Sequence, residues 1–166
     1  MSKVLYKNSE EVVSLVKSLA ESVAKQLPPK IPVTLMVKDG ARAMASYFSH
    51  ELINCISAQV EIKEVTTELR DGEFNIVTNI EPIVESAAKT SLVFLDIMKS
   101  SGDYLEQLID AFAPTKCVTA VLLKKPQALD GNYLFAQEVK DKWYFGIGME
   151  DKEGKGANLS ELYYYE

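Results

Sequence analysis

The stretch VFLDIMKSSGDYL, residues 93–105, contains the features that decide the fold of this chain. Its apolar run with a single acid predicts a buried strand, Ser-Ser-Gly predicts a turn, and an amphipathic helix is expected to follow. In open α/β sheets, ligands bind beyond the carboxyl ends of strands, where the amino end of a helix attracts anions. The stretch therefore predicts an α/β fold with a candidate anion site at the turn.

Short apolar strands alternate with helices on both sides of this stretch. Asn8 and Glu11 have the spacing of a capping box at the start of the first helix. Strands are expected at 33–37, 92–95, 117–123, 133–139 and 143–149, and helices after Gly40, over 81–89 and over 104–112. This order predicts a mostly parallel, twisted sheet flanked by helices. Segments 59–67 and 73–79 are expected to pair as an antiparallel hairpin, which would make the sheet mixed.

Length and composition predict one globular domain. The 166 residues suffice for a full hydrophobic core, and the formal net charge of -6 argues against nucleic acid or an anionic membrane surface as partner. No apolar stretch reaches membrane-spanning length and the N-terminus lacks a signal-peptide core, so a cytoplasmic protein without membrane contact is expected. The isolated Cys55 and Cys117 fit reduced thiols. A single histidine, His50, argues against a catalytic triad or a histidine-rich metal site.

Four stretches resemble motifs of the type I phosphoribosyltransferases, specifically the hypoxanthine-guanine branch: VKDG (37–40), DIMKSSGDY (96–104), LLKKP (122–126) and DKWYFGIGMED (141–151). The resemblance implies transfer of ribose 5-phosphate from phosphoribosyl pyrophosphate (PRPP) to a purine base, with Mg²⁺, and release of pyrophosphate. It also implies a single domain over residues 1–166. Within it, residues 1–30 would form an N-terminal helix region, 33–125 a core, and 126–166 C-terminal strands with a small hood.

The second of these stretches is similar to the family's E-D-I-I-D-T-G-x-T motif. By the resemblance, Asp96 contacts the ribose hydroxyls and the metal ion, and Ser100 stands where the family has an aspartate near the purine ring. These are the two catalytic positions that the resemblance implies. Ser101, Gly102, Asp103 and Tyr104 align with the phosphate-binding loop.

Asp103 changes the expected chemistry of that loop. Its carboxylate would repel a phosphate dianion and would itself favour the amino end of the following helix. The residue is therefore either a stand-in for the phosphate that the family binds or an ordinary helix cap.

The other three stretches supply the remaining site residues. Lys38 aligns with the lysine of the family's pyrophosphate turn, and Lys125 with a lysine that hydrogen-bonds the exocyclic oxygen of hypoxanthine or guanine. Trp143 stands where an aromatic ring stacks on the purine, and Glu150 where an aspartate binds magnesium. From the residues alone, Lys125 also fits a solvated strand end, and Trp143 a buried core anchor.

Several substrate-handling groups of the family are absent from this sequence. Ile97 replaces the second acid, Ser100 the base-side aspartate, and Ala157 an arginine that reaches the pyrophosphate. The segment 65–73 is too short for the family's mobile loop and lacks its Ser-Tyr pair. Because such groups position charge in the transition state, a slow or inactive enzyme is expected.

Three hypotheses remain open at this point. The chain is a purine phosphoribosyltransferase with a degraded site, a non-catalytic relative that binds a purine, a nucleotide or a partner protein for regulation, or a structural partner of an active paralogue. A homo-oligomer is expected, and the third hypothesis adds assembly with the paralogue. The tail ELYYYE (161–166) offers an aromatic edge for assembly, although it also fits an ordinary terminal strand.

Overall fold

Five parallel strands form the central sheet of the protein. The computed structural model describes residues 2–71, 73–100, 104–112 and 117–166. The sheet has the order β3-β2-β6-β7-β8, from strands β2 (Val33–Lys38), β3 (Val60–Val65), β6 (Ser91–Lys99), β7 (Cys117–Lys124) and β8 (Leu134–Glu138). Strands β2 and β6 are nearly continuous apolar runs because both of their faces are covered, as is usual for parallel sheets. The predicted α/β class is confirmed.

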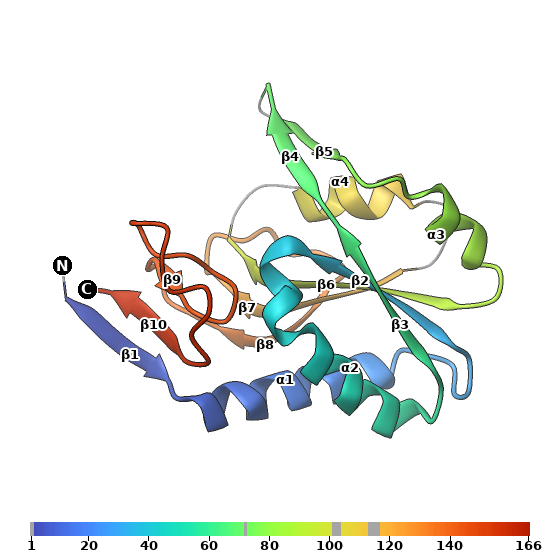
Figure 1. Ribbon diagram of the computed structural model, residues 1–166, viewed down its shortest axis with the longest axis horizontal. Coiled ribbons are helices and arrows are strands. Elements are labelled where there is room, and N and C mark those ends of the chain that lie inside the picture. The colour runs from blue at the N-terminus through green and yellow to red at the C-terminus, as the bar shows by residue number, and fades with distance from the viewer. Residues whose placement is uncertain (1, 72, 101–103, 113–116) are drawn as a thin grey trace.

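Helices cover both faces of this sheet (Figure 1). On one face lie α1 (Ser9–Ala24) and α2 (Arg42–Ile56), the second entered through a short 3-10 turn, η1 (Asp39–Ala41). On the other face lie α3 (Glu81–Ser86) and α4 (Tyr104–Ala111). The predicted capping box is present, since Asn8 and Glu11 exchange hydrogen bonds at the start of α1. Within the described ranges, no helix is long and apolar enough to cross a membrane.

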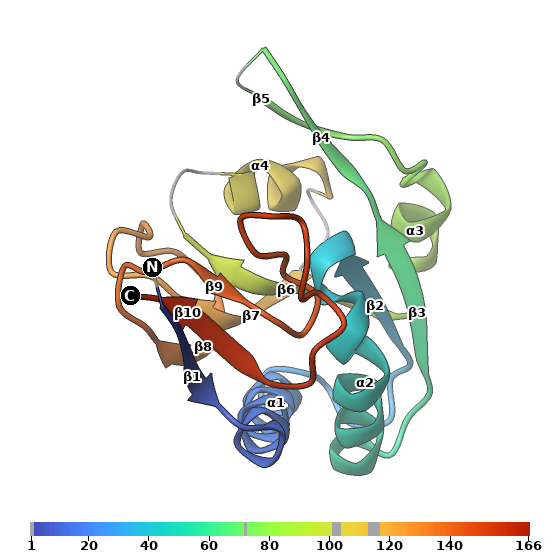
Figure 2. The ribbon, with the colours of Figure 1, turned by 60° about the vertical axis from the view of Figure 1, so that its left-hand side comes forward.

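The prediction of a mixed sheet is wrong. Residues 60–65 form β3 in parallel register with β2, with Val60 opposite Val33, because the α2 crossover returns the chain in the same direction. The expected hairpin is a separate two-stranded sheet of β4 (Thr67–Arg70) and β5 (Glu73–Ile76), which projects from the body (Figures 1 and 2). The position of the turn between the two strands was therefore predicted correctly. The strand before the turn is 67–70, however, and not the predicted 59–67.

A small second sheet, the hood, is built from both ends of the chain. It has the order β1-β10-β9, from β1 (Lys3–Lys7), β9 (Tyr144–Phe145) and β10 (Leu162–Tyr165). The two termini consequently lie side by side (Figures 1 and 2). The sequence did not predict β1, and the tail 161–166 is a terminal strand. Strand β8, within the C-terminal region 126–166, belongs to the central sheet instead of the hood.

The strand predicted over 143–149 is only two residues long. Gly146, Ile147 and Gly148 have φ values of 103°, 45° and 103°, which bend the chain away from the extended conformation. A Cβ on Gly146 would overlap the carbonyl oxygen of Glu161, so the backbone approaches too closely for a side chain. The two glycines therefore make a sharp turn that leads the chain back over α2.

Asp151 ties the hood together. Its buried carboxylate accepts hydrogen bonds from Lys3 Nζ (3.0 Å), from the Tyr165 hydroxyl (3.2 Å) and from the backbone N–H groups of Glu153 and Lys155. The hydrogen bond from Lys3, followed by that from the Lys155 backbone, holds the pKa of Asp151 far below its ordinary value of 3.8. One side chain thereby joins both terminal strands to the 151–155 turn.

Replacing Asp151 by asparagine is expected to make stability less dependent on acid pH. Because folding lowers the pKa of this carboxyl, its contribution is complete above its unfolded pKa and is lost as the pH falls. The free energy of unfolding of the wild type should therefore exceed that of Asp151→Asn by a constant margin between pH 5 and 7. This margin should be lost below about pH 4. Urea midpoints measured at several pH values check this, with Glu153→Gln as the control. A stability difference that does not change with pH would contradict the lowered pKa of Asp151.

Candidate functional site

The carboxyl ends of β2, β6 and β7 meet at one edge of the sheet and bring the predicted site residues together. Lys38 ends β2, Asp96 lies near the end of β6, and Lys125 follows β7. This is the edge at which parallel α/β sheets bind ligands. The geometry confirms that the stretches 37–40, 96–100 and 122–126 share one edge.

Lys38 and Asp96 contact each other directly. The Lys38 ammonium lies 3.4 Å from Asp96 Oδ2, and the other oxygen of Asp96 accepts the N–H of Ile97 at 2.7 Å. Asp96 is only 4% exposed. The resemblance had implied separate subsites for these residues, pyrophosphate for the lysine and ribose for the acid. In the structure each charge already offsets the other.

Ile97 replaces the second acid of the motif and lies in the hydrophobic core. It is 1% exposed and packs among the apolar side chains of α1, α2 and β2. An apolar side chain in that position supplies no hydrogen-bonding group to a ligand. The negative charge of the family's acid pair is therefore halved here, and the remaining acid is paired with a lysine.

Lys125 is held by an ion pair and is not a freely solvated lysine. Its ammonium lies 3.1 Å from Asp141 Oδ1, an oxygen that also accepts a hydrogen bond from Gln127 at 2.8 Å. The hydrogen bonds from Gln127 and Lys125 lower the pKa of Asp141. This arrangement fixes Lys125 beside the segment that leads to Trp143.

Trp143 is not a core anchor. Its side chain is 51% exposed, whereas its neighbours Tyr144 and Phe145 are buried. The indole N–H donates to the carbonyl oxygen of Glu150 at 3.2 Å, which holds the ring against the 146–150 turn. An exposed aromatic ring with a fixed edge is a suitable platform for stacking a planar ligand.

A backbone contact joins two of the motifs. A Cβ on Gly148 would overlap the carbonyl oxygen of Gly40, and the Gly148 N–H donates to the Ala157 carbonyl at 2.7 Å. The turn after β2 and the turn after β9 therefore touch through their backbones. Because only glycine permits this approach, Gly148 sets the position of the Trp143 loop relative to Lys38.

The predicted phosphate loop lies mostly outside the described residues. Ser100 follows β6 and is half-buried. Ser101, Gly102 and Asp103 are not among the described residues, and Tyr104 is the first residue of α4. Both interpretations of Asp103 therefore remain predictions.

The donor set fits magnesium only in part. Asp96 is paired with Lys38, whereas Glu150 is exposed, and no group of three or more potential ligands occurs in the described part of the chain. Mg²⁺ in proteins is usually held by one or two carboxylates together with phosphate oxygens of the substrate. Glu150 fits that role, and the metal role of Asp96 stays a prediction, because its carboxylate is paired with Lys38 in this structure.

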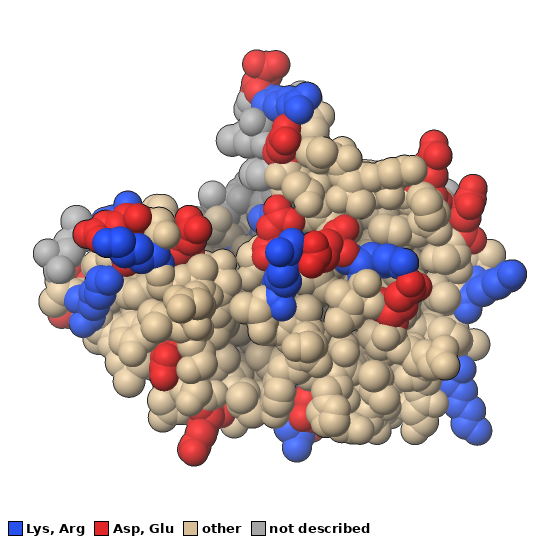
Figure 3. Space-filling model, in the orientation of Figure 1, with Lys and Arg blue, Asp and Glu red and all other residues tan. Residues whose placement is uncertain are grey.

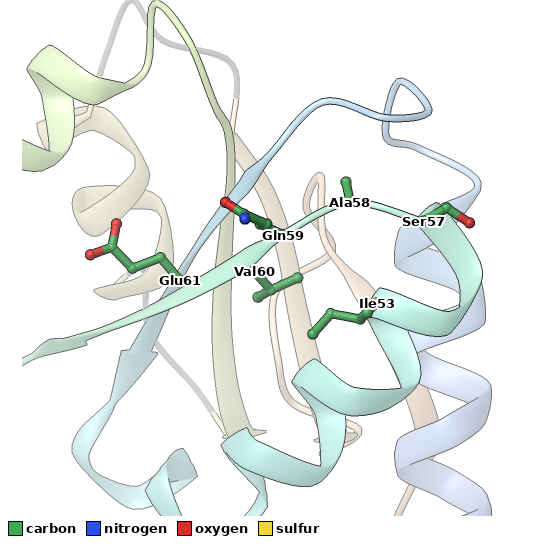
Figure 4. A pocket seen from close by; sticks show the side chains of 6 residues that line it. All are labelled: Ile53, Ser57, Ala58, Gln59, Val60 and Glu61. Carbon is green, nitrogen blue, oxygen red and sulfur yellow. The ribbon is translucent and has the colours of Figure 1, made fainter.

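The protein surface has two further features, a hollow and a face of mixed charge. A hollow of about 730 Å³ lies at the amino end of β3, at the opposite edge of the sheet. Its apolar side chains Ile53 and Val60 extend toward each other and Glu61 points away (Figure 4). On the face shown in Figure 3, acidic and basic side chains are interspersed. An exposed ion pair of this kind joins Arg42 of α2 to Glu64 of β3.

Four charged residues at the edge were missed by the sequence analysis: Lys99, Glu106, Lys124 and Asp130. Lys99 and Lys124 end neighbouring strands and pair with Glu106 and Asp130. A lysine at the end of an otherwise apolar strand was an available signal, but its partner depends on how α4 packs.

Comparison with known proteins shows the fold. No model of a protein family and no curated protein matches the chain. Among solved structures, hypoxanthine phosphoribosyltransferase from Trypanosoma cruzi, in complex with the product IMP, is 16% identical, with a TM-score of 0.78 and coverage of 98% of this chain and 94% of that one. A hypoxanthine-guanine phosphoribosyltransferase from Bacillus anthracis is 22% identical, with a TM-score of 0.78 and 98% of each chain covered.

A third structure, hypoxanthine-guanine phosphoribosyltransferase from L. donovani, is 16% identical, with a TM-score of 0.76 and coverage of 99% of this chain and 100% of that one. The likeness spans the central sheet and the hood, and at these identities it concerns the fold and not the chemistry. This chain therefore has the type I phosphoribosyltransferase fold in the form found in the hypoxanthine-guanine enzymes.

Proposed function

We propose that the chain binds a purine nucleotide at the carboxyl edge of its sheet and transfers phosphoribosyl groups from PRPP only slowly. The observation that carries this proposal is the exposed Trp143 ring, which follows by two residues the Asp141 that pairs with Lys125. The ring offers a stacking surface for the base, and the ammonium offers a donor to its exocyclic oxygen. Inosine 5′-monophosphate is the first ligand to test, because the similar Trypanosoma cruzi enzyme was solved with it.

The charge balance of the edge explains why slow transfer is expected. Breaking the bond from ribose to pyrophosphate develops positive charge on the ribose, which a nearby carboxylate pair would stabilise. Here Ile97 contributes no charge and Asp96 is paired with Lys38. Each missing stabilising group in such a site costs roughly 3 kcal/mol of barrier. Nucleotide binding, by contrast, would depend on the proposed base platform of Trp143 and Lys125.

Magnesium is part of the proposal only together with the phosphates of the ligand. Glu150 would hold the ion through its exposed carboxylate, with oxygens of the pyrophosphate group as further ligands. The ion would neutralise the charge of the phosphates. Once the ligand separates the Lys38–Asp96 ion pair, Asp96 would accept hydrogen bonds from the ribose hydroxyls and Lys38 would donate to the pyrophosphate.

A regulatory or assembly role is the second candidate function. The hood presents aromatic side chains on β10, where Tyr163 and Tyr165 stack on Phe145 with ring centroids 5.4 and 5.1 Å apart. The rings of Tyr163 and Tyr165 are only partly buried, so the same face suits a second copy of the chain or an active paralogue. A cytoplasmic homo-oligomer is the form that we expect. Sedimentation of the purified protein distinguishes a monomer from such an assembly.

Isothermal titration calorimetry tests the nucleotide proposal. Inosine 5′-monophosphate should bind the wild type, and Lys125→Ala should weaken it about tenfold, because a hydrogen bond to a charged group contributes at least about 1.5 kcal/mol. Lys17→Ala, an exposed lysine on α1, is the control.

The same titration with PRPP and magnesium, followed by an assay with hypoxanthine, tests the catalytic half. A kcat of about 10 s⁻¹, which is usual for enzymes, would contradict the proposal of slow transfer. No heat with inosine 5′-monophosphate would contradict nucleotide binding.

A further inference from the structure

A cluster of four charged residues lies at the carboxyl edge, and no step of the proposed function uses it. Lys99 and Lys124 end β6 and β7 and are register partners, so their side chains leave the sheet next to each other. Lys99 Nζ lies 2.8 Å from Glu106 Oε2, and Lys124 Nζ lies 2.7 Å from Asp130 Oδ1. We call these four residues the lysine-acid cluster.

The two acids of the cluster come from different elements that pack together. Glu106 belongs to the first turn of α4, and Asp130 to the loop between β7 and β8. A Cβ on Gly131 would lie 2.9 Å from Glu106 Oε1, so the loop that carries Asp130 touches the Glu106 carboxylate. Two lysines that are register partners are thus each paired with a carboxylate, and the elements that carry these carboxylates touch.

Burial within the cluster is uneven. The lysine side chains are 0% and 12% exposed, whereas the side chains of Glu106 and Asp130 are 37% and 95% exposed. The positive charges are therefore fixed inside the edge, and the negative charges approach them from solvent. Asp130 can rotate into water at little cost because it is almost fully exposed, whereas Glu106 can leave the buried Lys99 only when another anion takes its place.

Stability does not account for the cluster. Buried ion pairs are often no more stable than apolar side chains of the same size, because desolvation offsets the attraction. The resemblance places an apolar residue at the position of Lys99, so the chain carries a charge where the fold does not require one. An anionic ligand, in contrast, would gain from two preorganised ammonium groups.

We propose that Lys99 and Lys124 form an anion site for the phosphate group of the nucleotide and that Glu106 and Asp130 close it in the free protein. The phosphate competes with the two carboxylates, which turn toward solvent when it binds. This inference deepens the proposed function, on which it rests for the identity of the ligand. The hydrogen bond to Asp130 raises the pKa of Lys124, which is consistent with an ammonium that holds its charge throughout.

The inference predicts opposite effects for an acid and its lysine. Asp130→Asn should raise the affinity for inosine 5′-monophosphate about threefold, because it removes the competing carboxylate. Lys124→Met should lower this affinity about tenfold. Neither variant should change the affinity for inosine, which lacks the phosphate. Glu61→Gln is the matched control, because it changes the charge equally and breaks an exposed ion pair with Lys63 at the far end of β3.

Lys99 needs a paired variant, because removing Glu106 alone would leave a buried charge without its partner. The double variant Lys99→Met/Glu106→Gln should fold with a thermal midpoint near that of the wild type and bind inosine 5′-monophosphate about tenfold more weakly. Equal affinities of wild type, Asp130→Asn and Lys124→Met for this nucleotide would overturn the inference.

Failure of the proposed function is distinguishable from failure of this inference. If neither inosine 5′-monophosphate nor inosine binds the wild type, the proposed function fails and inorganic pyrophosphate becomes the probe. Pyrophosphate should then raise the thermal midpoint of Asp130→Asn more than that of the wild type, and not that of Lys124→Met. Equal shifts in all three proteins would overturn the anion site as well.

Discussion

Gly148→Ala is expected to lower the free energy of unfolding by about 3 kcal/mol. The new Cβ would overlap the Gly40 carbonyl oxygen and crowd the Ile97 side chain, and the residue would keep a φ of 103°. For a chain of this size, the thermal midpoint should fall by roughly 6 to 12 °C.

Gly154→Ala is the matched control for this variant. Gly154 also has a positive φ, of 74°, but the nearest atom to an added Cβ is 3.9 Å away. Only the backbone penalty applies, so the cost should be about 1 kcal/mol and roughly 2 to 4 °C. Equal losses in the two variants would show that the contact between Gly40 and Gly148 is not tight in solution.

Trp143→Ala is expected to lower the affinity for inosine 5′-monophosphate about 10- to 100-fold without unfolding the protein. Stacking of a base on an aromatic side chain contributes about 1 to 3 kcal/mol, and each 1.4 kcal/mol is tenfold in affinity. Because the ring is 51% exposed, its removal leaves no cavity in the core.

Trp143→Phe separates stacking from other roles of this residue. Phenylalanine keeps a stacking surface but loses the N–H that donates to Glu150, so affinity should recover to within about threefold of the wild type. Calorimetry with the nucleotide and a thermal scan of each variant provide the measurement. Loss of affinity together with a large drop in thermal midpoint would instead indicate a structural role for the ring.

Local patterns were sufficient for most elements of the fold. The capping box at Asn8, the apolar strand at 33–37 and the turn at Asp71 are each encoded within a few residues, so sequence spacing predicts them. Pairing partners are different, because they depend on segments far apart in the chain. Strand β3 was therefore assigned to the wrong neighbour, and β1 was not predicted at all.

Site residues divide in the same way. The resemblance named Lys38, Asp96 and Lys125, and the structure brings their strands to one edge. That Lys38 neutralises Asp96, and that Asp141 fixes Lys125, follows from distances between residues 16 or more positions apart in the chain.

Hydrophobic periodicity is a local property, so the amino-acid sequence is enough to predict the alternation of strands and helices, and hence the α/β class. The sequence also specifies which residue types stand at the strand ends. Which charges face each other there, and which remain available to a ligand, depends on the tertiary structure. The reason is physical: the field at the edge depends on a few ångströms of separation between side chains, and packing of the hood, α4 and the sheet sets those separations.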